Sequence, residues 1–283
     1  MQIRHGAPGS PVRSIFISDL HLGWKFSKAD AALEFLQAQE PDYVYLVGDI
    51  FDTWKLGRKW CWKPAHSQII RQLIEWGRRG TRIRYTPGNH DDFWRQFLGD
   101  FGILDAGSFE IADHFIHHLA DGRRLMVLHG DQFDTVELRA SWLSAIGSGG
   151  YDLMMWGEHY FNLASRSIGL KERTFIGAVK RRVKRAITFV SQFEKRLAEF
   201  ARAHDCDGIV CGHIHTPTIA EHYGVHYFNT GDWVENRSAL VEHFDGGMEL
   251  IQGTPGTGGS HSSYLQPLPQ VETPELNPDS VYA

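Results

Sequence analysis

Short apolar runs of four or five residues recur along the chain, each bounded by glycine, proline or polar side chains. Runs of this kind, rich in β-branched and aromatic residues, are typical of buried strands. The first five occur at 14–18, 43–47, 82–86, 125–128 and 208–211. Three later runs lie close together with turn residues between them, and we expect them to add antiparallel strands at 225–228, 239–244 and 248–251.

Two segments between the first three runs have apolar residues every three or four positions, which predicts amphipathic helices at 29–39 and 66–78. Strands that alternate with helices predict parallel pairing through right-handed crossovers. We therefore expect an α/β fold, a four-layer α/β/β/α sandwich of two sheets with helices outside. The domain is expected over 13–251, and the Gly-, Ser- and Pro-rich segment 252–283 is expected to be a mobile tail.

The chain between the fourth and fifth strands is longer than a crossover requires, which indicates a helical insert at about 136–203. Apolar residues from Ile176 to Phe200 form one helical face, and a basic stretch lies within that segment. One interpretation is a helical pair packed on the sandwich with solvated charges. The other is a lid with an apolar inner surface for acyl chains, on which Lys180, Arg181 and Lys184 contact a diphosphate or an anionic membrane surface.

Each of the first five strands is followed by residue types that bind metals. In chain order these residues are Asp19, His21, Asp49, Asn89, His129, His213 and His215. In open α/β sheets ligands bind beyond the carboxyl ends of the strands, so we expect these side chains to meet at one edge. A single histidine after a strand is more often a surface or core residue, but five such strand ends favour a metal site. Carboxylates combined with imidazoles suit Mn, Fe or Zn better than Mg or Ca.

The spacing of these residues adds detail to the predicted site. Residues two apart in an extended segment point the same way, so one ion can contact both Asp19 and His21. His213 and His215 can instead serve one ion each. Glycines before the ligands, at Gly48, Gly88 and Gly212, allow the backbone to approach the ions closely and to form turns with positive φ. Tryptophans near these loops either line a groove or pack in the core: Trp54, Trp60, Trp62 and Trp94.

Five sequence blocks contain the candidate ligands, in the order DLH (19–21), GDIFD (48–52), GNHD (88–91), HGD (129–131) and GHIH (212–215). This set resembles the calcineurin-like metallophosphoesterase superfamily. Within it, the phrases ISDLHLG, VGDIFDTW, HGDQFD, GHIHTP and NTGDW resemble the UDP-2,3-diacylglucosamine diphosphatases of lipid A synthesis. The chain departs from those diphosphatases at one position, because they usually read GNRD and it carries His90, the residue of the wider superfamily.

The resemblance implies two divalent ions, each held by three residues and sharing Asp49 as a bridge. The first set is Asp19, His21 and His215, and the second is Asn89, His129 and His213. Manganese is the metal that the resemblance implies, with iron and zinc as alternatives. Two such ions a few ångströms apart activate water and bind phosphoryl oxygens.

The resemblance also implies roles for the residues beside the ligands. His90 would protonate the leaving oxygen or stabilise charge on the phosphoryl group. Asp91 would hydrogen-bond the His90 ring and fix its tautomer, although it could instead cap the helix that follows. Asp52 and Asp131 are candidates for hydrogen bonds to ligand histidines, or for turn residues.

Three functions from different classes remain open at this point. The first is hydrolysis of UDP-2,3-diacylglucosamine to a lipid monophosphate and UMP, which the resemblance and the insert favour. The second is a soluble phosphodiesterase or nucleotide pyrophosphatase on the same scaffold, which the GNHD block favours. The third is a metal-binding scaffold for a partner protein, which the presence of all seven ligands and His90 argues against.

Composition limits the partners and the compartment. The 283 residues include 29 Lys+Arg and 34 Asp+Glu, a net charge of −5, so we expect no nucleic-acid partner. Three distant cysteines, Cys61, Cys206 and Cys211, form neither a disulfide framework nor a CxxC zinc motif and indicate the cytoplasm. Residues Met1 to Val12 lack the apolar core of a signal peptide, so we expect none, and no apolar run is long enough to span a bilayer. Any membrane contact is thus expected to be peripheral, and the oligomeric state stays open.

Overall fold

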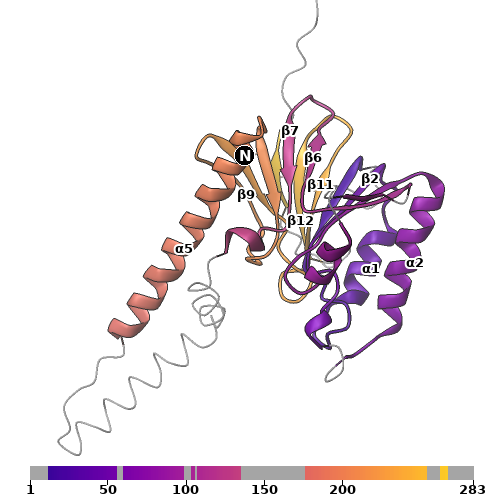
Figure 1. The fold of residues 1–283 in the computed structure, drawn as a ribbon, viewed down its shortest axis with the longest axis horizontal. Coiled ribbons are helices and arrows are strands. Elements are labelled where there is room, and N and C mark those ends of the chain that lie inside the picture. The colour runs from indigo at the N-terminus through magenta and orange to yellow at the C-terminus, as the bar shows by residue number, and fades with distance from the viewer. Residues whose placement is uncertain are drawn as a thin grey trace, which may run out of the picture.

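The computed structural model describes residues 12–55, 60–98, 103–105, 107–134, 176–253 and 262–266. Side chains are described within 12–55, 60–98, 107–134, 190–253 and 265–266. Two sheets face each other in the middle of the molecule, with helices α1 and α2 on one outer side and α5 on the other (Figure 1). This arrangement confirms the predicted α/β/β/α sandwich.

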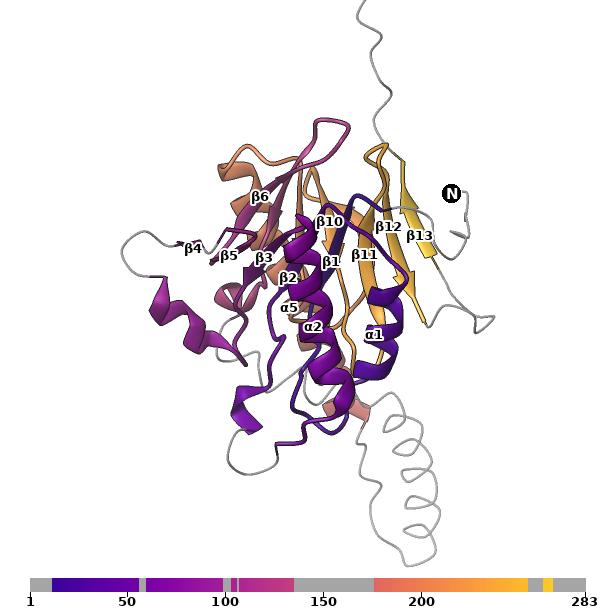
Figure 2. The ribbon, with the colours of Figure 1, turned by 90° about the vertical axis from the view of Figure 1, so that its right-hand side faces the viewer.

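The larger sheet has eight strands. Their order is β13 (Ser262–Leu265), β12 (Met248–Gln252), β11 (Ser238–Glu242), β1 (Ser14–Ile17), β2 (Tyr43–Val47), β3 (Arg82–Thr86), β5 (Phe109–Ala112) and β4 (Ile103–Asp105). Strands β1, β2 and β3 run parallel, and β11 lies antiparallel to β1. Helices α1 (Ala29–Gln37) and α2 (Pro64–Arg79) lie in front of this sheet in Figure 2.

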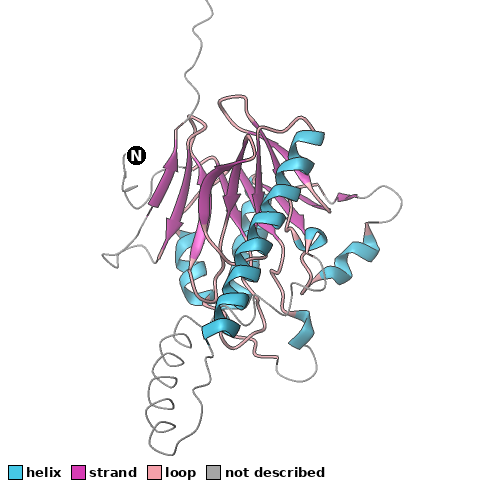
Figure 3. Ribbon diagram, turned by 90° about the vertical axis from the view of Figure 1, so that its left-hand side faces the viewer, coloured by secondary structure: helices cyan, strands magenta, loops and turns pink. Residues whose placement is uncertain are grey.

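The smaller sheet has five strands, in the order β6 (Phe115–His118), β7 (Arg124–Val127), β8 (Gly208–Cys211), β10 (Val225–Asn229) and β9 (Thr218–His222). Helix α5 (Ile176–Ala203) crosses its outer face, as Figure 3 shows. Short 3-10 helices follow three strand ends: η1 (Thr53–Lys55), η2 (Asp92–Phe97) and η4 (Asp131–Phe133). None of the described helices combines the length and apolar character that a membrane crossing requires.

The eight strands expected from the apolar runs are all present, with one wrong pairing. Strand β10 is antiparallel to β9 but parallel to β8, because the chain crosses over through β9 before it returns beside β8. Strands β4, β5, β6, β9 and β13 were not predicted. Strand β13 pairs with β12 inside the segment that we expected to be a mobile tail; 254–261 and 267–283 lie outside the described residues.

Three apolar clusters hold the layers together. One lies between α1, α2 and the larger sheet and includes Phe35 and Trp76, and another fills the space between the two sheets. The third joins α5 to the smaller sheet through Phe193 and Leu197, both fully buried. Full burial of such a side chain contributes about 1.5–3 kcal/mol, so the carboxyl half of α5 is firmly anchored.

The structure describes only part of the predicted insert. The long helix of the insert is present as α5, whereas 135–175 lie outside the described residues. The side chains of Lys180, Arg181 and Lys184 also lie outside them, so their substrate role stays a prediction. The domain and insert boundaries likewise stay predictions.

Candidate metal centre

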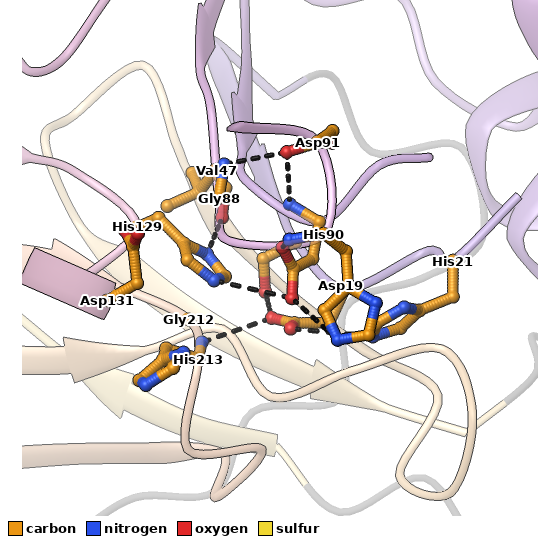
Figure 4. Close-up of polar contacts among 12 residues, drawn as sticks. Asp19, His21, Val47, Gly88, His90, Asp91, His129, Asp131, Gly212 and His213 are labelled. Carbon is orange, nitrogen blue, oxygen red and sulfur yellow. Dashed lines mark hydrogen bonds and ion pairs between the residues drawn. The ribbon is translucent and has the colours of Figure 1, made fainter. Parts of the chain in front are cut away.

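The predicted ligands meet at the edge where the parallel strands of both sheets end. Three of the five strand ends, β1 to β3, belong to the larger sheet and two, β7 and β8, to the smaller one. Loops of the smaller sheet contact loops of the larger sheet at this edge. The His213 backbone N–H donates to Asp19 Oδ2 at 3.2 Å, and His129 Nε2 lies 3.5 Å from Asp49 Oδ2 (Figure 4). The site thus straddles both sheets at a single edge.

Asp19, His21 and His215 form the first predicted ligand group. One potential ligand atom from each lies within 4.8 Å of those of the other two. Asp19 Oδ2 accepts hydrogen bonds from the Ser18 hydroxyl at 2.5 Å and from a backbone N–H. Asp19 Oδ1 faces the histidines, 2.9 Å from His215 Nε2 and 3.9 Å from His21 Nε2. The carboxylate is therefore oriented by one oxygen and offers the other to the site.

Asp49 occupies the centre of the site. It forms close groups both with His21 and His90 and with Asp19 and His129, each within the same 4.8 Å limit. His129 is fixed from behind, since its Nδ1 lies 2.8 Å from the Val47 carbonyl and donates to it, which turns Nε2 toward Asp49. A carboxylate between two ligand groups is placed as a bridge between two ions would be.

Asn89 and His213 lie at the same edge but less tightly grouped. Asn89 Oδ1 is buried and has no hydrogen-bond partner among the described residues. The His213 ring centre is 5.2 Å from that of His129, while its Nε2 lies 3.2 Å from Asp134 Oδ2. Both residues line a cavity of about 340 Å³ together with His21, Asp49 and His215.

The donor set fits a pair of divalent cations. Among the described residues, the buried polar atoms at this edge that have no hydrogen-bond partner include His21 Nδ1, Asn89 Oδ1 and His129 Nε2. A buried polar atom left unsatisfied costs about 1–3 kcal/mol, and several at one place indicate a missing partner. Carboxylate, amide and imidazole donors together match Mn, Fe or Zn, so the residues present suit the ions that the sequence predicts.

Backbone strain is concentrated at the same residues. Eight described residues other than glycine have positive φ, and five of them are predicted ligands: Asp19 (52°), His21 (45°), Asp49 (53°), His213 (66°) and His215 (51°). Each such conformation costs on the order of 1–3 kcal/mol and persists where function requires it. No sequence pattern showed this feature, which supports the site independently of the motifs.

The three glycines act mainly by allowing close contact. A Cβ on Gly88 would lie 2.2 Å from Asp49 Oδ1, and one on Gly212 would lie 2.6 Å from Asp19 Oδ2. Gly48 has φ +75°, and a Cβ there would lie 2.3 Å from the His129 ring. All three glycines lie against predicted ligand side chains, whereas their approach to the ions stays a prediction. Of the three, only Gly48 has positive φ.

His90 has a different partner from the one predicted. Its Nδ1 lies 3.1 Å from Asp52 Oδ1, and its Nε2 lies 4.0 Å from Asp49 Oδ2. Asp52 also approaches His21, at 3.8 Å between Oδ2 and Nδ1. Asp52 thus hydrogen-bonds His90, which is not a predicted ligand, and only approaches the predicted ligand His21. Asp52 rather than Asp91 orients the His90 ring.

Asp91 instead organises the loop backbones. Its buried carboxylate accepts backbone N–H groups from Gly88 and Ile50, both at 2.7 Å, and also the Tyr85 hydroxyl. It makes no side-chain cap to η2. Both interpretations of Asp91 were therefore wrong, because its side chain turns back beneath the loops that carry Asp49 and Gly88. Burial, together with Asp49, raises the pKa of Asp91 to about 6.

Two further acidic residues lie near the second ligand group. Asp131, a candidate partner of a ligand histidine, instead accepts two hydrogen bonds from Arg95, each at 2.8 Å. The acidic partner of the predicted ligand His213 is instead Asp134. The sequence analysis missed Asp134, as well as Ser18 behind Asp19 and Tyr85 behind Asp91, because none of them stands out by spacing. The turn after β10 also holds a ligand loop in place, because the Asn236 side-chain amide donates to the His215 carbonyl at 2.8 Å.

Electrostatics divides the histidines into two kinds. Burial lowers the pKa of His21 to about 4, and the nearby carboxylates only partly oppose this. Burial would also lower the pKa values of His129 and His215, but Asp49 raises the first to about 10 and Asp19 raises the second to about 9. Burial would raise the pKa of Asp49, yet the neighbouring imidazoles, His129 first, hold it far below its ordinary value.

These shifts predict that metal binding releases protons. In the metal-free protein His129 and His215 are protonated at neutral pH, whereas a ligand imidazole must be neutral. Filling both positions should therefore release about two protons, and affinity should rise about tenfold per pH unit and per proton toward pH 9. Titration calorimetry in buffers of different ionisation enthalpy measures the release. An affinity that is unchanged between about pH 6 and 8 would contradict it.

The tryptophans divide between the two interpretations that the sequence left open. Trp54 is 56% exposed, lines the cavity at the site and stacks on His90, with ring centres 3.9 Å apart. Trp60 and Trp62 stack on each other and are exposed. Trp94 instead packs against the core beneath α2. The groove interpretation thus holds for Trp54 and the core interpretation for Trp94.

A two-sheet sandwich with aspartates, histidines and an asparagine converging at one edge defines a metallophosphoesterase class of site. The family model for calcineurin-like phosphoesterases matches residues 12–217. The chain belongs to this family and is a metal-dependent phosphohydrolase.

Relatives with a named activity match most of the chain. It is 27% identical over 274 residues to a UDP-2,3-diacylglucosamine hydrolase of Aeromonas salmonicida, covering 94% of this chain and 96% of the relative. The enzyme of the same name from Neisseria meningitidis serogroup C is 28% identical, with 82% and 93% coverage. Among solved structures, the Escherichia coli phosphoesterase YfcE aligns at 16% identity over 90% of this chain and 98% of its own, with a TM-score of 0.44.

Proposed function

We propose that this phosphohydrolase cleaves the diphosphate bond of UDP-2,3-diacylglucosamine, giving UMP and a lipid monophosphate for lipid A synthesis. The observation that carries the proposal is the position of Asp49 between two groups of metal-binding side chains. The substrate is supported by the hydrolases that match most of this chain. The ions are proposed to be manganese, held by the two predicted ligand sets.

Bound at this edge, two cations would supply Lewis-acid activation of water and charge stabilisation on the phosphoryl oxygens. The chain's own residues orient the reaction. Asp52 holds His90 Nδ1, so His90 Nε2 points toward Asp49 and can donate a proton to the leaving oxygen. The Val47 carbonyl fixes the His129 tautomer, and Asp91 fixes the loops that carry Asp49 and His90.

Peripheral membrane contact is part of the proposal, because the substrate carries acyl chains. Nine large apolar side chains are exposed among the described residues. Five of them lie in the loops or in η2, on the segments that follow strands β1, β2 and β3, without lining the cavity: Phe26, Trp60, Trp62, Phe93 and Phe97. Aromatic side chains suit the interfacial zone of a bilayer. Lys180, Arg181 and Lys184 are proposed to contact the diphosphate or lipid headgroups. The three cysteines are free, which supports a cytoplasmic location at the inner face of the membrane.

A soluble phosphodiesterase or nucleotide pyrophosphatase is the second candidate, and His90 favours it. The decisive assay gives the manganese-loaded protein UDP-2,3-diacylglucosamine in detergent micelles, and UDP-glucose and bis(p-nitrophenyl) phosphate in buffer. The proposal predicts UMP release from the lipid substrate at a far higher kcat/KM than from UDP-glucose. Turnover of the soluble substrates alone would reject it in favour of the second candidate. Metal analysis of the protein as isolated tests the choice of manganese.

A further inference from the structure

The cavity at the metal edge has an aromatic wall that the metal ligands do not explain. Ten residues line this cavity of about 340 Å³. Seven of them are site residues already described, and the remaining three are Trp24, Trp54 and Lys55. No aliphatic side chain is among the ten. The described part of the cavity therefore offers flat rings and charges beside the place where the phosphoryl group would bind.

Trp54 is the exposed part of that wall. One face of its indole stacks on His90 with ring centres 3.9 Å apart and planes 25° apart, yet 56% of the residue stays exposed. His90 Nε2 in turn lies 4.0 Å from Asp49 Oδ2. A stack that begins beside the central carboxylate and ends in an exposed indole resembles an aromatic platform to which one further ring can be added.

Trp24 and Lys55 complete the platform. The Trp24 ring meets His21 edge-on at 5.8 Å, and the Lys55 ammonium lies 5.7 Å from the centre of the Trp24 ring. A lysine on an aromatic wall next to a phosphoryl site supplies positive charge to a phosphate while the rings contact an uncharged planar group.

An acyl chain fits this wall poorly. A flexible alkyl chain laid against His90, Asp52 and Asn89 would cover polar groups without giving them partners, which is costly. Another cavity, of about 400 Å³, lies between α2 and the larger sheet. Leucine and isoleucine side chains supply much of its lining, together with aromatic rings, and it shares no lining residue with the first. Flat polar surroundings and a stacked indole instead suit a heterocyclic base, which stacks on aromatic side chains and keeps its edges hydrated.

We propose that Trp54, with Trp24 and Lys55 beside it, is a subsite for the planar base of a nucleotide whose phosphoryl group lies at the metal edge. The inference deepens the proposed function and rests on it for the position of the phosphoryl group. Trp54 is then a specificity-determining residue, and the enzyme distinguishes a nucleotide from a simple phosphate ester by stacking.

Three ligands with the same phosphate separate stacking from other contacts: UMP, 5,6-dihydro-UMP with a non-planar ring, and ribose 5-phosphate with no base. Binding to the manganese-loaded protein is measured by titration calorimetry. UMP is expected to bind about tenfold or more tightly than the other two, from the usual strength of base–aromatic stacking. Equal binding of the three ligands, or no measurable binding of UMP, would overturn the subsite.

Variants at Trp54 test the chemistry of the wall. Trp54→Phe should keep the preference for UMP, whereas Trp54→Leu and Trp54→Ala should lose it and bind UMP no better than ribose 5-phosphate. A wall that favours any apolar group would keep the preference in Trp54→Leu, and that result would overturn the proposal. Phe244→Ala is the matched control, since Phe244 is 55% exposed but does not line the cavity, and this variant should keep the preference for UMP.

The outcomes separate this inference from the proposed function. Hydrolysis of UDP-2,3-diacylglucosamine with a KM that Trp54→Leu leaves unchanged would keep the function and reject the subsite. Absence of that hydrolysis, with UMP binding that depends on Trp54, would reject the lipid substrate and keep the subsite. A Trp54→Leu protein with full metal content and an unchanged circular dichroism spectrum confirms that the comparison is made on folded protein.

Discussion

Asp49→Asn is expected to abolish phosphohydrolase activity and to weaken the binding of both divalent ions together. Asp49 is buried and belongs to two close groups of side chains that could hold a metal. One group also contains His21 and His90, and the other contains Asp19 and His129. Changing a residue that only orients a ligand costs about 10–100-fold in metal affinity. Replacing a carboxylate that two ions share should weaken metal binding more than this. We therefore expect the affinity for each ion to fall by at least about a hundredfold.

The measurement is metal content by mass spectrometry, with titration calorimetry for the two binding steps. Asp42→Asn is the matched control, because Asp42 is an exposed aspartate just before β2, whereas Asp49 follows the other end of the same strand. It should keep both ions and full activity. If Asp49→Asn lost one ion and kept the other at normal affinity, Asp49 would be a ligand of a single ion and the binuclear arrangement would be wrong.

The site could be predicted from the sequence because the carboxyl ends of parallel strands lie at the same edge of a sheet. Asp19 and Asp49 follow buried parallel strands, and such strands place their carboxyl ends at one edge whatever the loops do in detail. The strands themselves were visible because they are continuous apolar runs, as in β2 and β8. Two sheets were expected, but nothing in those runs showed which strands belong to which sheet.

Other features depended on contacts between distant segments. Strand β6 was missed because it ends in two histidines, of which His117 is buried and satisfied by Tyr45 and Glu242 from the other sheet, both at 2.8 Å. Asp91 was misassigned because adjacency to His90 in the chain suggested a contact, whereas its carboxylate reaches back to the Asp49 loop. Positive φ at the ligands is likewise a property of the folded loops, because aspartate and histidine tolerate it more often than most residues but adopt it only where the fold requires it.

His90→Asn is expected to reduce turnover by about 10²–10⁴-fold while both ions remain bound, the range found for loss of a general acid or base. His90 Nε2 points toward Asp49 at 4.0 Å, close to where the phosphoryl group would bind, but His90 is not among the predicted ligands. Asp52→Asn should cause a smaller loss of the same kind, because Asp52 orients His90 through the 3.1 Å contact at Nδ1.

Substrates with different leaving groups distinguish the two proposed roles of His90, which are general-acid catalysis and charge stabilisation on the phosphoryl group. A general acid matters most when the leaving oxygen is basic, so His90→Asn should impair hydrolysis of an alkyl phosphodiester far more than that of bis(p-nitrophenyl) phosphate. Equal losses on both substrates would assign His90 to charge stabilisation on the phosphoryl group instead. His118→Asn serves as the control, since His118 is exposed at the end of β6, and it should not change either rate. Unaltered turnover in His90→Asn, with normal metal content, would remove His90 from the mechanism.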